Sequence, residues 1–352
     1  MSNIKFSQLH DVNNPTSIHG IYPYRGKISS VEAKLICEQL PRNSTLLDPF
    51  CGSGTIIFEG ICNHLNVYGA DNNPLAISLC KGKLDSLKKS VIEAEKEVDN
   101  IILKAKKTTD FNPMPDMALK HFHQETANEI MKTIEYFDYM SDYLKAAFFG
   151  TIALAARGCN HYKWTSSTVG KDINPKRYIS FFEKFKEKVR KHHPKKTFDK
   201  INANVYLKDS RTLSDFIPSK SIDFVFTSPP YFDALDYTAY YGKIIYWILG
   251  MDRNEIRKGL IQVVQSYEDD MRQVLKEIIK ITKDDAQIVF VVGDKKIGKD
   301  IINGGSFFSS LLHHKPNQII ERQYTGTSSQ VFDKLNKTSR REQIVIWNKR
   351  SW

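Results

Sequence analysis

The spacing of apolar and polar residues predicts an α/β fold. An apolar run at 44–48 leads into a glycine turn and an amphipathic helix, and a second unit has a strand ending at Asp71 and a helix opening near Pro74. Helical patterns at 240–250 and 269–282 lie among the later strand signals. Those strand signals fall at 203–209, 221–230, 285–294, 316–324 and 342–349. The pattern predicts a doubly wound, mostly parallel sheet of about seven strands with helices on both faces.

The periodicity changes between residues 88 and 200. This block contains four charged helical patterns, separated by joints rich in Pro, Gly and Ser, at 91–107, 123–140, 141–158 and 178–193. We therefore expect one α/β domain built from residues 1–87 and 201–352, with residues 88–200 as a basic helical insertion.

Composition is that of a globular protein with a full core. Of the 352 residues, 41% are apolar and 26% are charged, and no stretch approaches the length of a membrane span. The first fifteen residues lack the basic and then apolar pattern of a signal peptide. We therefore expect a cytoplasmic protein without a membrane partner.

The net charge of +11 suits a polyanionic partner. Residues 171–200 contain eleven Lys or Arg and four Asp or Glu, so most of the surplus lies there. A surface that contacts phosphates and a solvated helix face explain this run equally well.

The cysteines and histidines give no metal signal. Five cysteines form no CxxC pair, and we expect them to be reduced and mostly buried. Three histidines near the insertion, His121, His123 and His161, lack cysteine or carboxylate partners at ligand spacing. We therefore predict ordinary polar roles for them and no metal site.

The first chemical candidate is the turn "DPFCGSGT", residues 48–55. Gly52 and Gly54 allow close approach of a ligand to the backbone, and Asp48 and Phe50 can contact it from the strand end. Neither a third glycine of a dinucleotide fingerprint nor the lysine of a P-loop is present. Asp71 follows about twenty residues later, where such folds bind ribose hydroxyls, although it can equally cap the next helix.

The second candidate is "TSPPY", residues 227–231. If the strand ending at Phe226 lies beside the strand ending at Asp48, the two motifs face each other across one cleft. Two prolines make the segment a stiff ledge of carbonyl oxygens, with the Ser228 hydroxyl and the Tyr231 ring beside them. The amino group of a nucleobase fits this ledge, because Ser228 and a carbonyl near Pro229 can accept its hydrogens while Tyr231 stacks on the ring.

Together the two motifs resemble those of the S-adenosylmethionine-dependent amino-methyltransferases of DNA. Residues 18–36, "YGADNN", "LKDSRTL" and "RREQIVIWNK" are similar to further segments of that family, in the family order. The resemblance implies a class I methyltransferase fold, which is Rossmann-like, with S-adenosylmethionine as cofactor and double-stranded DNA as partner. It also implies direct methyl transfer to a flipped-out base, without a covalent enzyme adduct.

The matching positions imply roles for individual residues. The catalytic loop would be Ser228, Pro229, Pro230 and Tyr231. The cofactor residues would be Tyr22, Tyr24, Lys27, Asp48, Phe50, Gly52, Gly54, Asp71, Asp209 and Thr227. Family members with serine at the first loop position mostly modify cytosine N4, so Ser228 favours cytosine over adenine N6.

The long insertion departs from better-known members of the family. We expect DNA-binding and target-reading residues at 157–177 and in the basic helix that follows, or in the loop 325–342. The candidate side chains are Lys163, Trp164, Lys171, Arg177, Arg340 and Arg341. A cognate restriction endonuclease is an expected partner of such an enzyme.

Three other functions stay open at the level of sequence. They are an adenine-N6 DNA methyltransferase, an RNA amino-methyltransferase and a non-catalytic nucleic-acid-binding subunit. RNA relatives more often place Asp or Asn before Pro-Pro-Tyr, and a subunit without activity has no chemical need for both intact motifs.

Overall fold

A computed structural model of the chain describes most of its residues. The described ranges are 4–6, 17–24, 28–160, 175, 177–230, 238–263, 265–297, 300–324 and 340–352.

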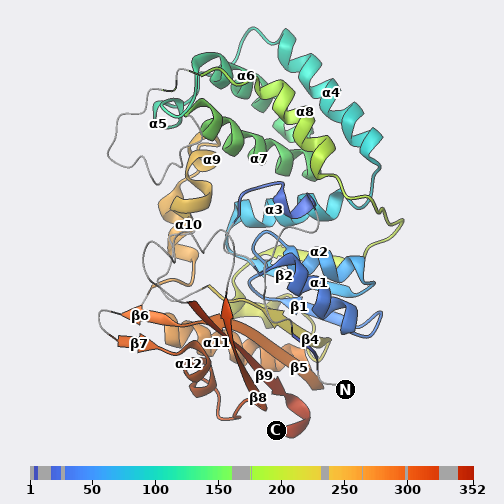
Figure 1. Cartoon of the computed structure of the whole chain (residues 1–352), viewed down its shortest axis with the longest axis vertical. Coiled ribbons are helices and arrows are strands. Elements are labelled where there is room, and N and C mark those ends of the chain that lie inside the picture. Colours follow the sequence, from blue (N-terminus) through green and yellow to red (C-terminus); the bar gives the residue numbers. More distant parts are fainter. Residues whose placement is uncertain are drawn as a thin grey trace.

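A seven-stranded sheet forms the centre of the α/β part (Figure 1). Its strands lie in the order β3-β2-β1-β4-β5-β9-β8, and all neighbours from β3 to β5 are parallel. Strand β9 runs antiparallel between β5 and β8. The strands are β1 (Thr45–Asp48), β2 (Asn66–Asp71), β3 (Ala203–Leu207), β4 (Ile222–Thr227), β5 (Thr282–Gly293), β8 (Gln318–Tyr324) and β9 (Arg340–Asn348). The prediction of a mostly parallel, doubly wound sheet is confirmed.

Strands β1 and β4 are direct neighbours, although 173 residues separate their nearest ends in the sequence. Leu46 pairs with Phe224 and Leu47 with Val225. The expected neighbourhood of the strand ending at Asp48 and the strand ending near Phe226 is therefore confirmed, and both motifs begin at the same edge of the sheet.

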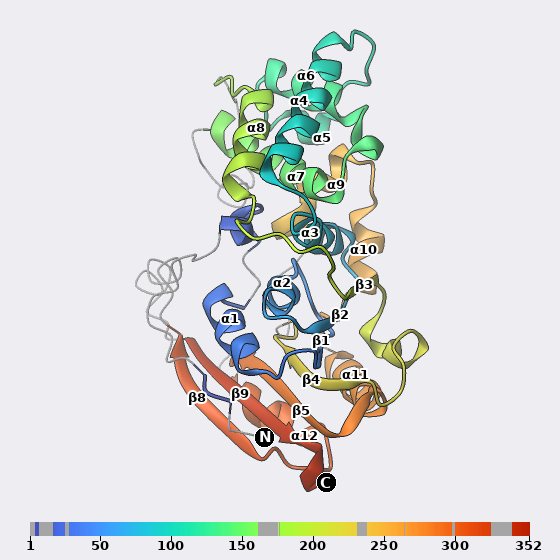
Figure 2. The same ribbon diagram turned by 90° about the vertical axis from the view of Figure 1, so that its right-hand side faces the viewer.

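Alternating side chains of the strands enter two separate hydrophobic cores. Leu46, Phe224 and Phe226 lie in one core, while Leu47 and Val225 lie in the other. The first core contains α1 (Ser30–Gln39), α2 (Thr55–Cys62) and α3 (Pro74–Asp85). The second contains η4 (Ser210–Asp215), α11 (Tyr267–Ile281) and α12 (Gly304–Ser310). Figure 2 shows α1 and α11 on opposite sides of the sheet.

The insertion forms a helical layer beyond α3 at one end of the molecule (Figures 1 and 2). Its elements are α4 (Val91–Lys107), α5 (Asp116–Leu119), α6 (Gln124–Ile134), η2 (Phe137–Tyr139), α7 (Asp142–Cys159) and α8 (Phe181–His192). A capping box between Ser90 and Glu93 begins α4. The rings of Phe148, Phe181 and Phe185 pack against one another inside the layer. These residues belong to the same hydrophobic core as α1–α3, so the insertion and the α/β part share one core.

Several basic side chains of α8 make their contacts inside the protein, and two of them pair with acidic residues of the insertion. Lys186 pairs with Asp99 of α4 at 2.8 Å, and Arg190 pairs with Glu95 of the same helix. Lys188 is buried. These contacts favour a structural role for α8 over a surface dedicated to phosphates.

Several elements were not predicted from the sequence. They are η1 (Ser17–Gly20), α1, α5, η4, α10 (Arg253–Gly259), α12, the hairpin β6 (Lys295–Ile297) and β7 (Asp300–Ile302), and η6 (Lys349–Ser351). The expected helix at 240–250 is a π-helical turn, η5 (Thr238–Gly242), followed by α9 (Lys243–Ile248). In the described part of the chain, no helix has both the length and the apolar character needed to cross a membrane.

Gly82 sets the distance between α3 and the insertion. A Cβ atom there would lie 2.5 Å from Ala146 Cβ and 2.6 Å from the backbone oxygen of Asp142. We predict that Gly82→Ala lowers the free energy of unfolding by about 1–3 kcal/mol, because both neighbours are rigid parts of α7. Chemical denaturation tests this. Gly259→Ala is the matched control, since a methyl group at Gly259 has nothing within 4 Å; equal losses in the two variants would contradict the packing argument.

Candidate active site

A cleft opens where β1, β2 and β4 end. It encloses about 600 Å³ of empty space, part of it open to solvent. The carboxyl ends of parallel strands are where such sheets bind ligands. The lining residues are Tyr24, Phe50, Gly52, Asp71, Asn72, Asn73, Ser210, Ser228, Pro230, Leu260 and Ile261.

The glycine turn between β1 and α2 needs both of its glycines. Gly52 and Gly54 have φ angles of +50° and +74°, a backbone region that favours glycine. A Cβ atom at Gly54 would also lie 2.3 Å from the sulfur of Cys80, whereas one at Gly52 would meet the Tyr24 ring at 3.4 Å. Gly54 therefore allows α2 to pack on α3, and Gly52 keeps the backbone open beside Tyr24 in the cleft.

Asp71 lies in the cleft at the end of β2. Its carboxylate accepts hydrogen bonds from the backbone nitrogens of Gly52 at 2.9 Å and Asn73 at 2.8 Å. Burial outweighs these hydrogen bonds and raises the pKa of Asp71 to about 6. Each oxygen keeps a second lone pair, so the carboxylate can still accept hydrogen bonds from a ligand.

Asp48 connects the two motifs. Its Oδ1 accepts a 2.6 Å hydrogen bond from Thr227 Oγ1 at the end of β4, and a 3.2 Å bond from the Phe50 nitrogen. Asp48 is 3% exposed and Thr227 is fully buried, and neither is among the cleft-lining residues. Burial raises the pKa of Asp48 to about 7, although the hydrogen bond from Thr227 acts in the opposite direction.

The serine-proline loop lines the same cleft as the glycine turn. Ser228 and Pro230 face the cleft, while Pro229 is buried. The carbonyl oxygen of Pro230 accepts a 2.6 Å hydrogen bond from the hydroxyl of Tyr267, which is 2% exposed. Sequence reasoning missed Tyr267, because α11 lies 36 residues further along the chain and carries no motif. Tyr231 lies outside the described residues.

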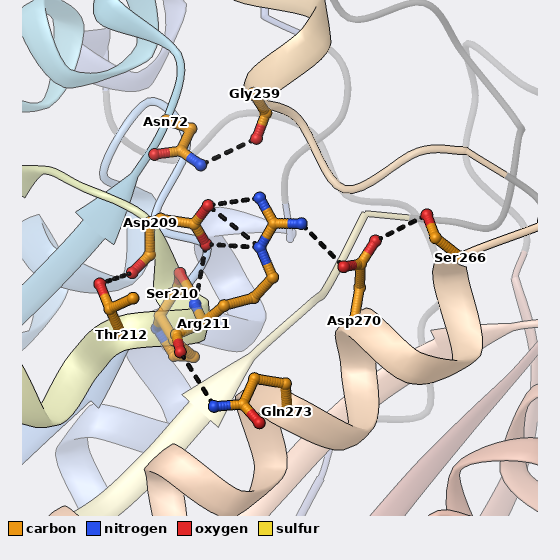
Figure 3. A network of polar contacts seen from close by, with 10 residues as sticks. Asn72, Asp209, Ser210, Arg211, Thr212, Gly259, Ser266, Asp270 and Gln273 are labelled. Atoms are coloured by element: carbon orange, nitrogen blue, oxygen red, sulfur yellow. Dashed lines mark hydrogen bonds and ion pairs between the residues drawn. The ribbon is translucent and has the colours of Figure 1, made fainter.

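Asp209 belongs to a polar network between η4 and α11 (Figure 3). Burial raises its pKa, but hydrogen bonds from Arg211 outweigh this and leave the pKa lowered. The Arg211 Nε lies 3.0 Å from both carboxylate oxygens, and Nη1 reaches Asp270 at 2.7 Å. The neighbouring residues Ser210 and Asn72 line the cleft, and Asn72 Nδ2 donates to the Gly259 carbonyl at 2.9 Å. The role of Asp209 toward the cofactor stays a prediction.

The N-terminal segment places two tyrosines near the glycine turn. Tyr22 and Tyr24 are each 5% exposed, and Tyr24 lines the cleft. Burial, and secondarily the nearby Tyr246, raise the pKa of Tyr22 well above its usual value. Lys27 lies outside the described residues.

The predicted DNA-binding residues are described only in part. Lys163, Trp164 and Lys171 lie outside the described residues, and Arg340 begins β9. Arg177 and Arg341 are exposed. The backbone oxygen of Arg341 accepts a 3.4 Å hydrogen bond from the nitrogen of Asp294, just beyond the carboxyl end of β5.

A basic and aromatic cluster at the junction of α5 and α9 was not predicted. The ammonium groups of Lys120 and Lys243 lie 5.7 Å and 4.7 Å from the ring centroid of Trp247, and His121 stacks on the same ring at 6.1 Å. Burial and the two lysines lower the pKa of His121 to about 4. The described residues contain no cluster of three potential metal ligands. The expected polar role of His121 fits this environment.

The donor set of the cleft fits a nucleoside cofactor. Asn73 is 2% exposed, and its Nδ2 has no hydrogen-bond partner among the described residues. Its Oδ1 accepts from Tyr246 Oη at 2.7 Å. S-adenosylmethionine presents ribose hydroxyl groups and a polar heterocycle. The cleft can bind these groups through the unused Asn73 donor, the Asp71 carboxylate and the open backbone at Gly52.

The strand order and this cleft define a doubly wound α/β fold with a ligand site at the carboxyl ends of its strands. The family model of "D12 class N6 adenine-specific DNA methyltransferase" matches residues 30–286. The chain belongs to this family and is therefore an S-adenosylmethionine-dependent DNA amino-methyltransferase.

Two curated proteins are similar to the chain. The type II methyltransferase M.MjaII of Methanocaldococcus jannaschii is 23% identical over 399 aligned positions, covering 83% of this chain and 75% of that protein. The type II methyltransferase M.MvaI of Kocuria varians is 44% identical over 50 residues, which is 14% of this chain and 11% of that protein. Both relatives are named as type II methyltransferases.

Solved structures give weaker matches. The rRNA methyltransferase aviRa of Streptomyces viridochromogenes has a TM-score of 0.38 at 15% identity and covers 96% of this chain and 91% of its own. A protein titled PH0851 has a TM-score of 0.37 at 10% identity, covering 90% of this chain and 45% of its own. TM-scores this low give no information about the substrate of this chain.

We predict that cofactor affinity rises with pH through about 6, because ribose hydroxyls donate to the ionised form of Asp71. Calorimetric titration with S-adenosylmethionine between pH 5 and 7 measures this. Asp71→Asn should weaken binding by roughly 10- to 100-fold, since it replaces a charged acceptor, and should remove the step near pH 6. A step of the same size in the Asn variant would contradict the assignment to Asp71.

A second pH prediction concerns the stability of the free protein. The pKa of Asp48 is raised on folding, so its protonated form is favoured in the folded state, and stability decreases as pH rises from about 4 through 7. Asp48→Asn cannot ionise, yet it keeps an oxygen acceptor for Thr227. We expect the variant to gain about 2–4 kcal/mol over wild type between pH 4 and pH 8. Denaturation experiments measure the difference in free energy of unfolding between the variant and wild type. If this difference does not change between pH 4 and pH 8, Asp48 is ionised in the folded protein throughout the range, and the prediction is wrong.

Proposed function

We propose that the protein methylates the N4 amino group of cytosine at specific sites in double-stranded DNA. The observation that carries the proposal is the position of Ser228. A hydroxyl, rather than a carboxylate or an amide, heads the Ser-Pro-Pro segment that lines the same cleft as Gly52 of the glycine turn. Serine at this loop position is the form that the resemblance associates mostly with cytosine.

The loop supplies acceptors for an amino group. The Ser228 hydroxyl can accept one amino hydrogen and a carbonyl oxygen near Pro229 the other, while Tyr267 holds the loop through the Pro230 carbonyl. When bound, S-adenosylmethionine supplies a sulfonium methyl group, so the amino nitrogen forms the new N–C bond with its lone pair and the C–S electron pair stays on sulfur. The nitrogen then releases one proton to water. This reaction needs no covalent enzyme intermediate.

A basic cluster where α5 meets α9 supports a DNA substrate. The cluster of Lys120, Lys243 and Trp247 lies on α9 and beside α5, and Tyr246 of α9 contacts Asn73 of the cleft. The two lysines of this cluster suit contacts with DNA phosphates. The similarity to type II methyltransferases supports a role in restriction-modification, in which the product would protect sites from a partner endonuclease.

Adenine N6 is the second candidate for the methylated atom. The matching family model carries this specificity in its description, and it covers residues 30–286, which include both motifs. The two candidates share the cleft, cofactor and chemistry, and they differ in the ring that the Ser-Pro-Pro ledge receives.

Nucleoside mass spectrometry separates the candidates. The full chain is incubated with labelled S-adenosylmethionine and with DNA or RNA of mixed sequence, and the nucleic acid is then digested to nucleosides. N4-methylcytosine is the expected product. N6-methyladenine would establish the second candidate instead, and methylation of RNA alone would overturn both.

We predict that Ser228→Ala binds S-adenosylmethionine as wild type does but lowers kcat roughly 10²-fold, because one acceptor of the amino group is lost. Ser221→Ala is the matched control at the other end of the same strand, where the hydroxyl donates to the Pro218 carbonyl. Unchanged kcat in Ser228→Ala would remove this residue from the mechanism.

A further inference from the structure

The segment Ser17–Tyr24 forms part of the cofactor cleft but has no place in the sheet. It begins with η1 and ends at Tyr24, which lines the cleft beside Gly52. Ile18, His19 and Ile21 are each at most 1% exposed. The segment is therefore held by packing and hydrogen bonds to its neighbours, and those contacts determine where Tyr24 lies.

Two helices of the insertion contact the backbone of this segment. The ammonium group of Lys188 in α8 donates to the Ile21 carbonyl oxygen at 3.2 Å, and His192 Nδ1 contacts the Ser17 carbonyl oxygen at short range. Gly150 of α7 faces the same Ile21 oxygen, and a Cβ atom on Gly150 would lie only 1.8 Å from it. The Ile21 carbonyl group therefore packs against α7 in a space that any side chain at position 150 would fill.

The α/β part holds the other side of the segment. His19 Nε2 lies 2.8 Å from Glu59 Oε1 on α2. Lys83 Nζ on α3 lies 3.3 Å from His19 Nδ1 and 3.4 Å from Ser53 Oγ, within the glycine turn. Segment 17–24 is thus attached both to the cofactor turn and to the insertion.

Burying the ammonium group of Lys188 costs free energy that packing alone does not require. Its side chain is buried at 8% exposure, and burial lowers its pKa to about 8. A Met of similar length would avoid the cost of desolvating an ammonium group. The hydrogen bond to Ile21 is the contact that a Met could not make.

We propose that Gly150 and Lys188 are positioning residues for cofactor binding. Through Ile21 they fix the segment that carries Tyr24, so the helical insertion helps to build the cofactor site. This inference rests on the proposed use of S-adenosylmethionine.

Two substitutions test the inference in the full chain. Gly150→Ala should raise the dissociation constant for S-adenosylmethionine at least 10-fold, because the methyl group displaces Ile21. Lys188→Met should raise it about 3- to 10-fold, the size of one lost hydrogen bond, and Lys188→Arg should restore part of the loss. In both weakened variants we expect a raised KM for S-adenosylmethionine and an unchanged kcat at saturating cofactor.

Matched controls come from the same helices. Gly158→Ala lies on α7 but faces Ile179, and Lys186→Met lies on α8 but pairs with Asp99. Both should bind the cofactor as wild type does. The melting temperature of each free variant, measured in parallel, separates loss of fold from loss of binding.

The outcomes are distinguishable. Wild-type affinity in folded Lys188→Met overturns the inference, and so does an equal loss of affinity in the controls. If Gly150→Ala does not fold, Lys188→Met and its Arg counterpart still decide the question. A wild-type chain that does not bind S-adenosylmethionine would instead overturn the proposed function.

Discussion

The pairing of β1 with β4 is the constraint on which the site depends. The two strands are far apart in the sequence, yet each ends in one of the two chemical motifs, and the Thr227–Asp48 hydrogen bond joins them where the strands stop. This contact is buried, and burial favours the protonated carboxyl of Asp48 in the free protein. The distance between the glycine turn and the Ser-Pro-Pro loop is thus fixed by the sheet, and the flanking segments provide the rest of the cleft.

Those flanking segments come from several parts of the chain. Tyr24 enters from the N-terminal segment, Ser210 from η4, and Leu260 and Ile261 from the residues after α10. The Asp209–Arg211–Asp270 network joins η4 to α11, and Tyr267 of α11 holds the Pro230 carbonyl. One helix therefore supports both the loop proposed to hold the base and the segment next to the glycine turn.

Local sequence signals predicted the parts of the fold that have regular periodicity and clear ends. Strand β2 ends at Asp71, α3 begins at Pro74 behind the Asn73 cap, and α4 spans the predicted residues 91–107. The two motifs were placed at one sheet edge because parallel strands share their carboxyl ends. Short elements such as α10 and the β6–β7 hairpin were missed because three to seven residues carry too little periodicity.

Long-range contacts were the other part that sequence could not supply. Nothing in the local pattern of α8 distinguishes Lys188, which reaches Ile21, from Lys186, which pairs with Asp99. The charge surplus of residues 171–200 suited a phosphate surface and a solvated helix face equally, and a count of charges does not reveal that α4 supplies acidic partners. Likewise, Tyr267 and the unused Asn73 donor become recognisable only when the cleft is assembled.

The close packing of α7 on α3 at Gly82 has a consequence for how such enzymes can be recombined. The insertion shares a core with the α/β part and touches segment 17–24, so it is not a removable module on a linker. A chimera that exchanged residues 88–200 with those of a relative would bring a foreign surface to α3 and to Ile21. A workable boundary for such an exchange would have to include segment 17–24 and the outer face of α3 together with the insertion.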